Sequence, residues 1–323
     1  MTAPLIAAEG LVKHFPVRQD VFGRVSAQVQ AVAGVSLAIA PNEVLGLAGE
    51  SGSGKSTIGR LLLRLLDPTD GRISFAGQDV TALHDRGLRP FRRQAQIVFQ
   101  DPIGSLDPTM TIGAAIAEPL RLQGMANGPE LRERVGALLQ AVALPAGYYN
   151  RHPNELSGGQ RQRVVIARAL SVDPSFIVAD EPVSALDVSI QAQIINLLEE
   201  MRTRRGLAML LISHDIALME HLCDRIAVLY LGRVMEIGPA RDLVRAPRHP
   251  YTEALVSAVP EAARAGRRRI ILRGDIPNPA NPPAGCVFHT RCPYAQPDCS
   301  RIVPEMRPVA SGHLKACLRD DVP

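Results

Sequence analysis

Residues 49–57 read GESGSGKST, and this stretch decides the fold of the chain. It matches the phosphate-binding loop pattern G-x-x-x-x-G-K-[ST] at every fixed position. Glycines let the backbone wrap a phosphate chain, so that N–H groups of the loop and of the following helix point at it. Lys55 supplies a positive charge for the β- and γ-phosphates, and the Ser56 hydroxyl is placed to bind Mg²⁺. The stretch therefore predicts a site for a nucleoside triphosphate. The expected phosphate contacts are Gly49, Ser51, Gly52, Ser53, Gly54, Lys55, Ser56 and Thr57.

The sequence around the loop alternates between strand and helix patterns. The apolar run EVLGLA (43–48) precedes the loop, and the leucine-rich TIGRLLLRLL (57–66) follows it as a helix. Alternation of this kind builds a mainly parallel sheet covered on both faces. Residues 101–172 lack strand character and predict an inserted helical lobe. The strands are expected at 5–15, 31–40, 72–75, 94–99, 176–179, 208–213 and 225–230, with helices at 189–205 and 216–222 and an irregular segment at 17–28.

Composition places the chain among ordinary globular proteins. At 323 residues it has room for one large or two smaller domains, and its formal charge of +4 permits only modest attraction to anionic lipid or nucleic acid. No apolar stretch reaches the roughly 18 residues of a membrane span. The first ten residues also lack the basic start and apolar core of a signal peptide. We expect a cytosolic protein, unless a partner carries it to a membrane.

A strand that ends in two carboxylates predicts the second half of the nucleotide site. Residues 176–181 read FIVADE, and such strand ends lie beside the phosphate loop in sheets of this class. Asp180 is placed to hold Mg²⁺, directly or through water. Glu181 is placed to orient and deprotonate an attacking water.

The pentapeptide LSGGQ at 156–160 is the motif that points to a particular family of nucleotide-binding proteins. Ser157 is a good helix N-cap, the two glycines allow close approach, and an exposed helix N-terminus attracts an anion. Here the chain resembles the nucleotide-binding subunits of ABC transporters, whose signature this is. The resemblance implies that Ser157, Gly158, Gly159 and Gln160 serve the ATP of an opposite subunit, with two subunits closing head to tail.

Further motifs of that family follow in the expected order. By resemblance, Gln100 contacts Mg²⁺ and the attacking water, Asp187 in SALD (184–187) lies in the loop that crosses between subunits, and His214 contacts the γ-phosphate. Phe15 matches the position that stacks on adenine, although a core phenylalanine is nearly as plausible. The resemblance implies a P-loop NTPase core of α/β class, with an antiparallel N-terminal β subdomain and an inserted helical subdomain.

Other segments narrow the resemblance to ATPases of oligopeptide and dipeptide importers, as the second ATPase of the pair. They are HFPV (14–17), FQDPIGSLDPTMTIG (99–113), HPYTEAL (249–255) and NPPAGCVFHTRCPYAQPDCS (281–300). The implied partners are a homologous ATPase, two membrane-spanning permease subunits and, indirectly, an extracytoplasmic peptide-binding protein, with no nucleic acid. Nickel and sugar-peptide importers use the same ATPase type. A soluble ABC ATPase acting on ribosomes or DNA is disfavoured, because the chain has one phosphate loop and no long coiled coil.

The end of the chain carries a cysteine cluster. We expect a nucleotide-binding domain over residues 1–260 and an extension over 261–323, where Cys286, Cys292, Cys299 and Cys317 follow a proline-rich linker. Disulfides are disfavoured in a cytosolic chain. The spacings are wider than structural zinc prefers, whereas four thiolates suit an iron–sulfur cluster, and the resemblance also points to [4Fe-4S]. Zinc and no metal remain alternatives. His289 and His313 are possible substitute ligands, but we expect both on the surface.

Overall fold

The computed structural model describes residues 3–19, 25–184, 186–259 and 268–321, and it divides into two compact units. The first unit comprises Met1–Ile39, Val44–Thr81 and Leu211–Pro323, and the second comprises Ala40–Glu43 and Ala82–Leu210. Each unit is therefore assembled from stretches that are far apart in the sequence.

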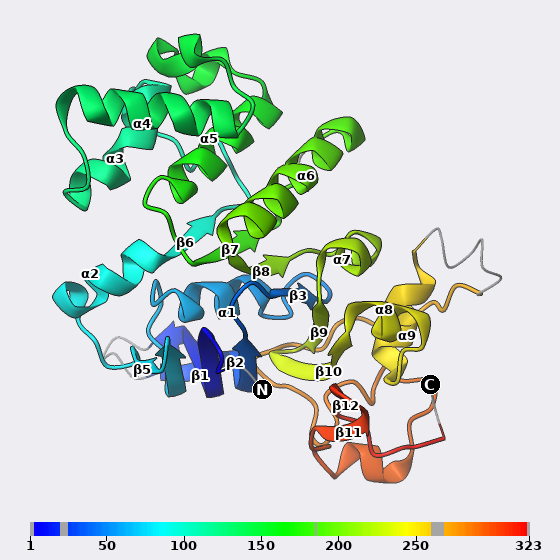
Figure 1. The fold of residues 1–323 in the computed structure, drawn as a ribbon. Coiled ribbons are helices and arrows are strands. Elements are labelled where there is room, and N and C mark those ends of the chain that lie inside the picture. The colour runs from blue at the N-terminus through cyan, green and yellow to red at the C-terminus, as the bar shows by residue number, and fades with distance from the viewer. Residues whose placement is uncertain (1–2, 20–24, 185, 260–267, 322–323) are drawn as a thin grey trace. The chain divides into compact units, whose positions relative to one another are not determined.

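The first unit contains the phosphate loop and the last part of the chain (Figure 1). Its elements are β1 (Ile6–Gln19), β2 (Val25–Ile39), β3 (Val44–Ala48), α1 (Lys55–Leu62), β4 (Asp70–Phe75), β5 (Gln78–Asp79), α7 (Ile216–Leu222), β9 (Arg225–Tyr230), β10 (Arg233–Pro239), α8 (Ala240–Arg245), α9 (Pro250–Ser257), the 3₁₀ turn η3 (Pro297–Ser300), β11 (Arg307–Ala310) and β12 (His313–Lys315). Strands β2, β1, β4 and β5 pair antiparallel in that order.

A second set of strands in this unit carries the loop. The buried strand β3 runs parallel to β9, β9 pairs antiparallel with β10, and β10 pairs in turn with β12. Figure 1 shows the red hairpin of β11 and β12 beside β10. The C-terminal extension thus continues the strand set that holds the strand leading into the loop.

The second unit is mainly helical. Its elements are α2 (Asp85–Gln94), β6 (Ala95–Val98), α3 (Ile112–Leu122), α4 (Gly128–Ala141), η1 (Ala146–Asn150), η2 (Pro153–Glu155), α5 (Gly158–Leu170), β7 (Phe176–Asp180) and α6 (Val188–Arg205). Strands β6 and β7 are parallel, and the division between units falls within β8 (Ala208–Ile212). The α/β class, the antiparallel N-terminal strands and the helical insertion are confirmed.

Residues 17–28 were expected to be irregular, and for the described part of them this is wrong. Strand β1 continues to Gln19 and β2 begins at Val25, with Arg18 paired to Ala27 and Gln19 to Val25. The two strands pair through their backbone groups, and such pairing does not require apolar residues. Register shifts along the pair mark bulges, which the alternation of side chains does not reveal.

Strand β10 was not predicted from the sequence, because the turn before it contains a leucine with positive φ, a backbone conformation that leucine rarely adopts. Leu231 and Gly232 join β9 to β10, and both have positive φ angles, of 45° and 72°. Two positive φ values suit a tight hairpin, but leucine rarely adopts one. The tertiary packing of the buried Leu231 side chain overrides its backbone preference.

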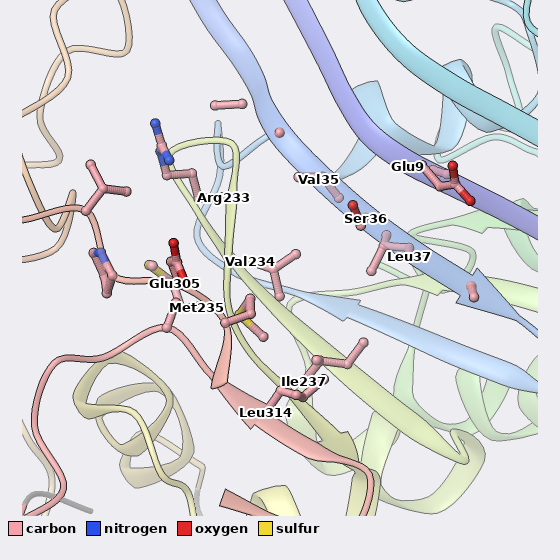
Figure 2. Close-up of a pocket in the computed structure, with 18 of the residues that line it drawn as sticks. Glu9, Val35, Ser36, Leu37, Arg233, Val234, Met235, Ile237, Glu305 and Leu314 are labelled. Carbon is pink, nitrogen blue, oxygen red and sulfur yellow. The ribbon is translucent and has the colours of Figure 1, made fainter. Parts of the chain in front are cut away.

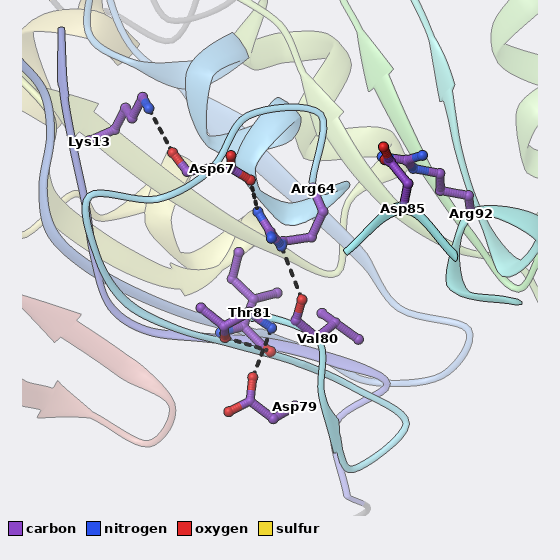
Figure 3. A network of polar contacts seen from close by, with 9 residues as sticks. Lys13, Arg64, Asp67, Asp79, Val80, Thr81, Asp85 and Arg92 are labelled. Atoms are coloured by element: carbon purple, nitrogen blue, oxygen red, sulfur yellow. Dashed lines mark hydrogen bonds and ion pairs between the residues drawn. The ribbon is translucent and has the colours of Figure 1, made fainter. Parts of the chain in front are cut away.

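Helix α1 covers Lys55–Leu62, whereas the sequence suggested residues 57–66. Just beyond the helix, Arg64 has a left-handed backbone with φ of 51°. Its side chain is nearly buried and makes the polar contacts drawn in Figure 3. Its Nε donates to the Val80 carbonyl at 3.0 Å, and its Nη1 pairs with Asp67 at 2.5 Å. Lys13 of β1 donates to the Asp67 carbonyl at 2.7 Å. These bonds fix the end of the loop helix to the antiparallel strands.

In the ranges that the structure describes, no helix has both the length and the apolar character to span a bilayer.

Candidate functional site

Two glycines of the phosphate loop, Gly49 and Gly54, stand where a side chain has no room. A Cβ at Gly49 would lie 2.3 Å from the Leu229 carbonyl oxygen, and one at Gly54 would lie 2.3 Å from the Ala31 carbonyl oxygen. Both residues also have positive φ, at 147° and 103°. A side chain at either position would displace the backbone behind the loop.

Charged and polar groups of the loop are held in a defined arrangement. The Lys55 side chain is nearly buried, and its Nζ donates to the carbonyl oxygens of Gly49 at 2.7 Å and Glu50 at 2.9 Å. Within the described structure the buried Ser53 hydroxyl has no hydrogen-bond partner. Buried polar groups normally have one, so the loop has unused bonding capacity where a phosphate oxygen is expected. Ser51 and Gly52 are exposed at the loop tip, and Ser56 and Thr57 open helix α1.

Two more predicted residues belong to the first unit. Phe15 of β1 is half-buried, and Lys13 Nζ lies 5.2 Å from the centroid of its ring. His214 is exposed just after β8. An exposed or half-exposed side chain at both positions is compatible with contact to a ligand.

Of the predicted metal and base residues, Gln100, Asp180 and Glu181 belong to the second unit, whereas Ser56 belongs to the first. Asp180 is the buried last residue of β7, and Glu181 follows it with φ of 46°. Gln100, which follows β6, donates from Nε2 to the Glu181 carboxylate at 3.2 Å. Left-handed backbone at a residue other than glycine is strained, and such strain concentrates at functional sites. The structure therefore brings Gln100 and Glu181 into contact, as their proposed shared role requires.

The LSGGQ segment opens helix α5 as the sequence predicted. The Ser157 hydroxyl accepts from the Gln160 N–H at 3.4 Å, and the Gln160 side chain accepts from the Ser157 N–H at 3.0 Å. This reciprocal pair is a capping box. A Cβ at Gly159 would lie 2.4 Å from Ile190 of α6, so the second glycine is a packing requirement. Asp187 is exposed at the N-cap of α6, while Ala185 of the SALD loop lies outside the described residues.

Comparison with known proteins decides the family. Residues 32–184 match the ABC transporter family, and residues 235–299 match the oligopeptide/dipeptide transporter C-terminal region. A putative peptide import ATP-binding protein of Brucella ovis is 54% identical over 320 residues, which covers 99% of each chain. The chain belongs to the ABC transporter family of ATPases. The oligopeptide transport ATP-binding protein AppF of Bacillus subtilis is 50% identical to this ABC ATPase over 94% of each chain.

Solved structures agree with the fold of the ABC ATPase. A dimeric ATP-binding cassette in a post-hydrolysis state, bound to ADP and Pi, superimposes with a TM-score of 0.66 at 31% identity. The superposition covers 73% of this chain and 99% of the cassette chain. The structure of cbiO1 from Clostridium perfringens, part of a transporter complex, matches with a TM-score of 0.66 at 25% identity, covering 82% and 99% of the two chains.

The four C-terminal cysteines of the ABC ATPase line one small cavity, together with His249, Pro250, Phe288, His289, Tyr294, Leu318 and Arg319. Cys286 and Cys299 are buried, and Cys292 and Cys317 are half-buried. Burial raises the pKa of the Cys286 thiol to about 11, with a further contribution from the three neighbouring cysteines. Burial also raises the pKa of Cys292. The fold gathers thiols that the sequence spreads over more than thirty positions.

The thiols are not arranged as ligands of a single metal ion. In the part of the chain that the structure describes, no group of three or more His, Cys, Asp or Glu side chains is placed to hold a metal ion. His289 lines the cavity, with Nδ1 2.8 Å from the Cys286 carbonyl oxygen. The expectation of a surface position is wrong for His313, which is 3% exposed and pairs through Nε2 with buried Glu236 at 2.6 Å.

A separate cavity of about 710 Å³ lies in the first unit (Figure 2). Its walls are mainly apolar and include Val35, Leu37, Met235 and Leu314. None of the residues predicted to contact the nucleotide lines it.

Proposed function

We propose that this ABC ATPase is the ATP-hydrolysing motor subunit of a membrane importer for oligopeptides or dipeptides. The observation that carries the proposal is the match of residues 235–299 to the oligopeptide/dipeptide transporter C-terminal region. Relatives that share nearly the whole chain length are named as a putative peptide import protein and an oligopeptide transport protein, which supports the same substrate class.

Within this function the residues take distinct roles. The loop of residues 49–57 binds the triphosphate of ATP, with Phe15 against the adenine ring. Ser56, Gln100 and Asp180 would hold Mg²⁺, which would supply positive charge against the charge that develops on the phosphates during hydrolysis. Glu181 deprotonates the attacking water, and His214 contacts the γ-phosphate. The contact of Gln100 with Glu181 supports a common position for the metal and water residues.

We further propose that the partner is a second, homologous ATPase, and that the two close head to tail. Ser157, Gly158, Gly159 and Gln160 would serve the ATP of that partner, and exposed Asp187 would lie in the crossing loop. Ser157 and Gly158 are exposed at the start of helix α5, which supports this role because a helix N-terminus attracts a phosphate. Two permease subunits would place the ATPase at the cytoplasmic face of the membrane as a peripheral protein, with an extracytoplasmic peptide-binding protein on the other side.

The experiment that tests the importer is affinity purification of the tagged chain from membranes, followed by reconstitution in lipid vesicles. We expect a homologous ATPase and integral-membrane subunits to co-purify, and we expect a peptide with its binding protein to stimulate ATP hydrolysis. Stimulation by nickel or a sugar-peptide, with none by peptides, would reassign the ligand. Ribosomal or DNA-bound partners without membrane subunits would contradict the motor role.

A second proposal concerns the four cysteines, which we infer hold a [4Fe-4S] cluster that stabilises the extension. The shared cavity of four thiols supports a common ligand. Structural zinc prefers shorter spacings than those between these cysteines, whereas four thiolates suit an iron–sulfur cluster. Because burial raises the pKa of Cys286, binding requires release of its proton and is favoured at higher pH.

The prediction for the cysteines is measurable on protein purified without oxygen. We expect brown protein with about four iron and four sulfide per chain. Replacing any one of Cys286, Cys292, Cys299 or Cys317 by serine should remove most of both. The matched control is Cys223→Ser, because Cys223 is buried away from the cavity lining and should leave the iron content unchanged. Colourless protein with one zinc per chain would establish the zinc alternative instead.

A further inference from the structure

The two parts of the chain matched to different families meet at one residue of the phosphate loop. Glu50 belongs to the part matched to ABC transporters, and Tyr251 and Arg291 belong to the part matched to the importer C-terminal region. The Glu50 N–H donates to the Tyr251 hydroxyl at 2.9 Å. The Glu50 carboxylate accepts from both terminal nitrogens of Arg291, at 2.6 and 3.2 Å.

These contacts use all the polar groups of Glu50. Its carbonyl oxygen accepts from Lys55 Nζ at 2.9 Å and from the Ser53 N–H at 3.2 Å. The residue that the extension holds is therefore one of the two, with Gly49, whose carbonyl oxygens accept from the phosphate-binding lysine. A shift of Glu50 would move a carbonyl partner of Lys55 and the neighbouring amides of the loop.

The two side chains that hold Glu50 are themselves fixed by packing. Arg291 is 8% exposed at its side chain, and its guanidinium carbon lies 5.9 Å from the ring centroid of Tyr230. Tyr230, Tyr251 and Phe288 are fully buried and pack on one another, with ring centroids 4.8 to 5.3 Å apart. Hydrogen bonding to Glu50 raises the pKa of Arg291, so its charge is permanent. A two-pronged arginine–carboxylate pair held this way has a fixed geometry.

Tyr251 lies in the first turn of helix α9, which begins at Pro250. The His249 Nδ1 caps helix α9 by accepting the Tyr251 N–H at 3.1 Å. Burial, and then the charge of Lys315, lower the pKa of His249 to about 3, so Nδ1 remains an acceptor at physiological pH. Residues 249–251 thus hold the Tyr251 hydroxyl in a fixed position beside the phosphate loop.

Charge gives the pair a second effect. Glu50 is a negative residue in a loop whose ligand is a polyanion, so an unpaired Glu50 would repel the phosphates. Arg291 neutralises the charge of the Glu50 carboxylate and holds that carboxylate against the extension.

We propose that Arg291 and Tyr251 are positioning residues through which the C-terminal extension sets the affinity of the phosphate loop for ATP. The proposal rests on the assignment of the loop to ATP within the proposed function. It requires no particular transported ligand.

The test is the Kd for ATP of the full chain, with KM and kcat in the reconstituted transporter. We expect Arg291→Met to raise Kd and KM for ATP by about five- to 150-fold, the range of typical coupling between sites, with little change in kcat. Arg291→Lys should give a smaller loss, because lysine keeps the charge but not the two-pronged bond. Adding Glu50→Gln to Arg291→Met should restore part of the affinity, because it removes the unpaired charge.

The matched control is Arg307→Met, which removes an ion pair with Asp320 and the hydrogen bonds of Arg307 to the carbonyl oxygens of Cys317 and Arg319, all elsewhere in the extension. We expect it to lower the melting temperature and leave the Kd for ATP within about twofold of wild type. An equal loss of affinity in Arg307→Met, or wild-type affinity in folded Arg291→Met, would overturn the proposal. If Arg291→Met does not fold, the Arg291→Lys variant and its pairing with Glu50→Gln decide the question. Wild-type protein that fails to bind ATP would contradict the proposed function itself, which is a distinguishable result.

Discussion

Glu181→Gln is expected to lower the kcat for ATP hydrolysis of the assembled transporter by about 10²- to 10⁴-fold, the usual contribution of a general base. Glutamine keeps the length of the side chain and an oxygen that can accept from Gln100, but it cannot take a proton from water. ATP binding should therefore persist, and the closed dimer should accumulate. Single-turnover phosphate release, measured together with ATP binding, separates the two effects.

The control for this variant is Asp173→Asn, which removes an exposed carboxylate of the same unit that pairs with Arg205. We expect its hydrolysis rate to match wild type. A Glu181→Gln transporter that hydrolyses ATP at the wild-type rate would show that another group activates the water.

Lys55→Met is expected to weaken ATP binding by about 3 kcal/mol, which is roughly a hundredfold in Kd. The ammonium group is the point charge for the β- and γ-phosphates, and methionine has a similar shape without charge or donors. The change also removes a donor from the Gly49 and Glu50 carbonyl oxygens. Isothermal titration with ATP measures the loss, and thermal unfolding shows whether the loop loosens.

Arg60→Met serves as the control for Lys55→Met. Arg60 is exposed on the same helix, so the variant removes an equal charge away from the loop contacts. We expect only a small change in Kd, because exposed charges are well screened. An equal loss in both variants would mean that general electrostatics, rather than the Lys55 position, governs ATP affinity.

Local sequence determined the parts of this protein whose physics is local. The left-handed backbone of Gly49 and Gly54 and the capping box of LSGGQ are set by residue type and by neighbours within a few positions. Their structure could be predicted because backbone conformation and helix capping are decided at that range. Strand β10 could not, because Leu231 adopts its positive φ only under the constraint of tertiary packing.

Tertiary structure alone decided what the C-terminal extension touches. The contacts of Glu50 with Tyr251 and Arg291 join residues 201 and 241 positions apart, and no local pattern announces them. The four cysteines likewise line one cavity in a fold where β12 pairs with β10 and Phe288 packs on Tyr230 and Tyr251. Contacts across such separations depend on how whole elements pack, and the sequence encodes that packing through many weak interactions at once. The motifs therefore identified a nucleotide site, while the fold showed which distant side chains hold its loop in place.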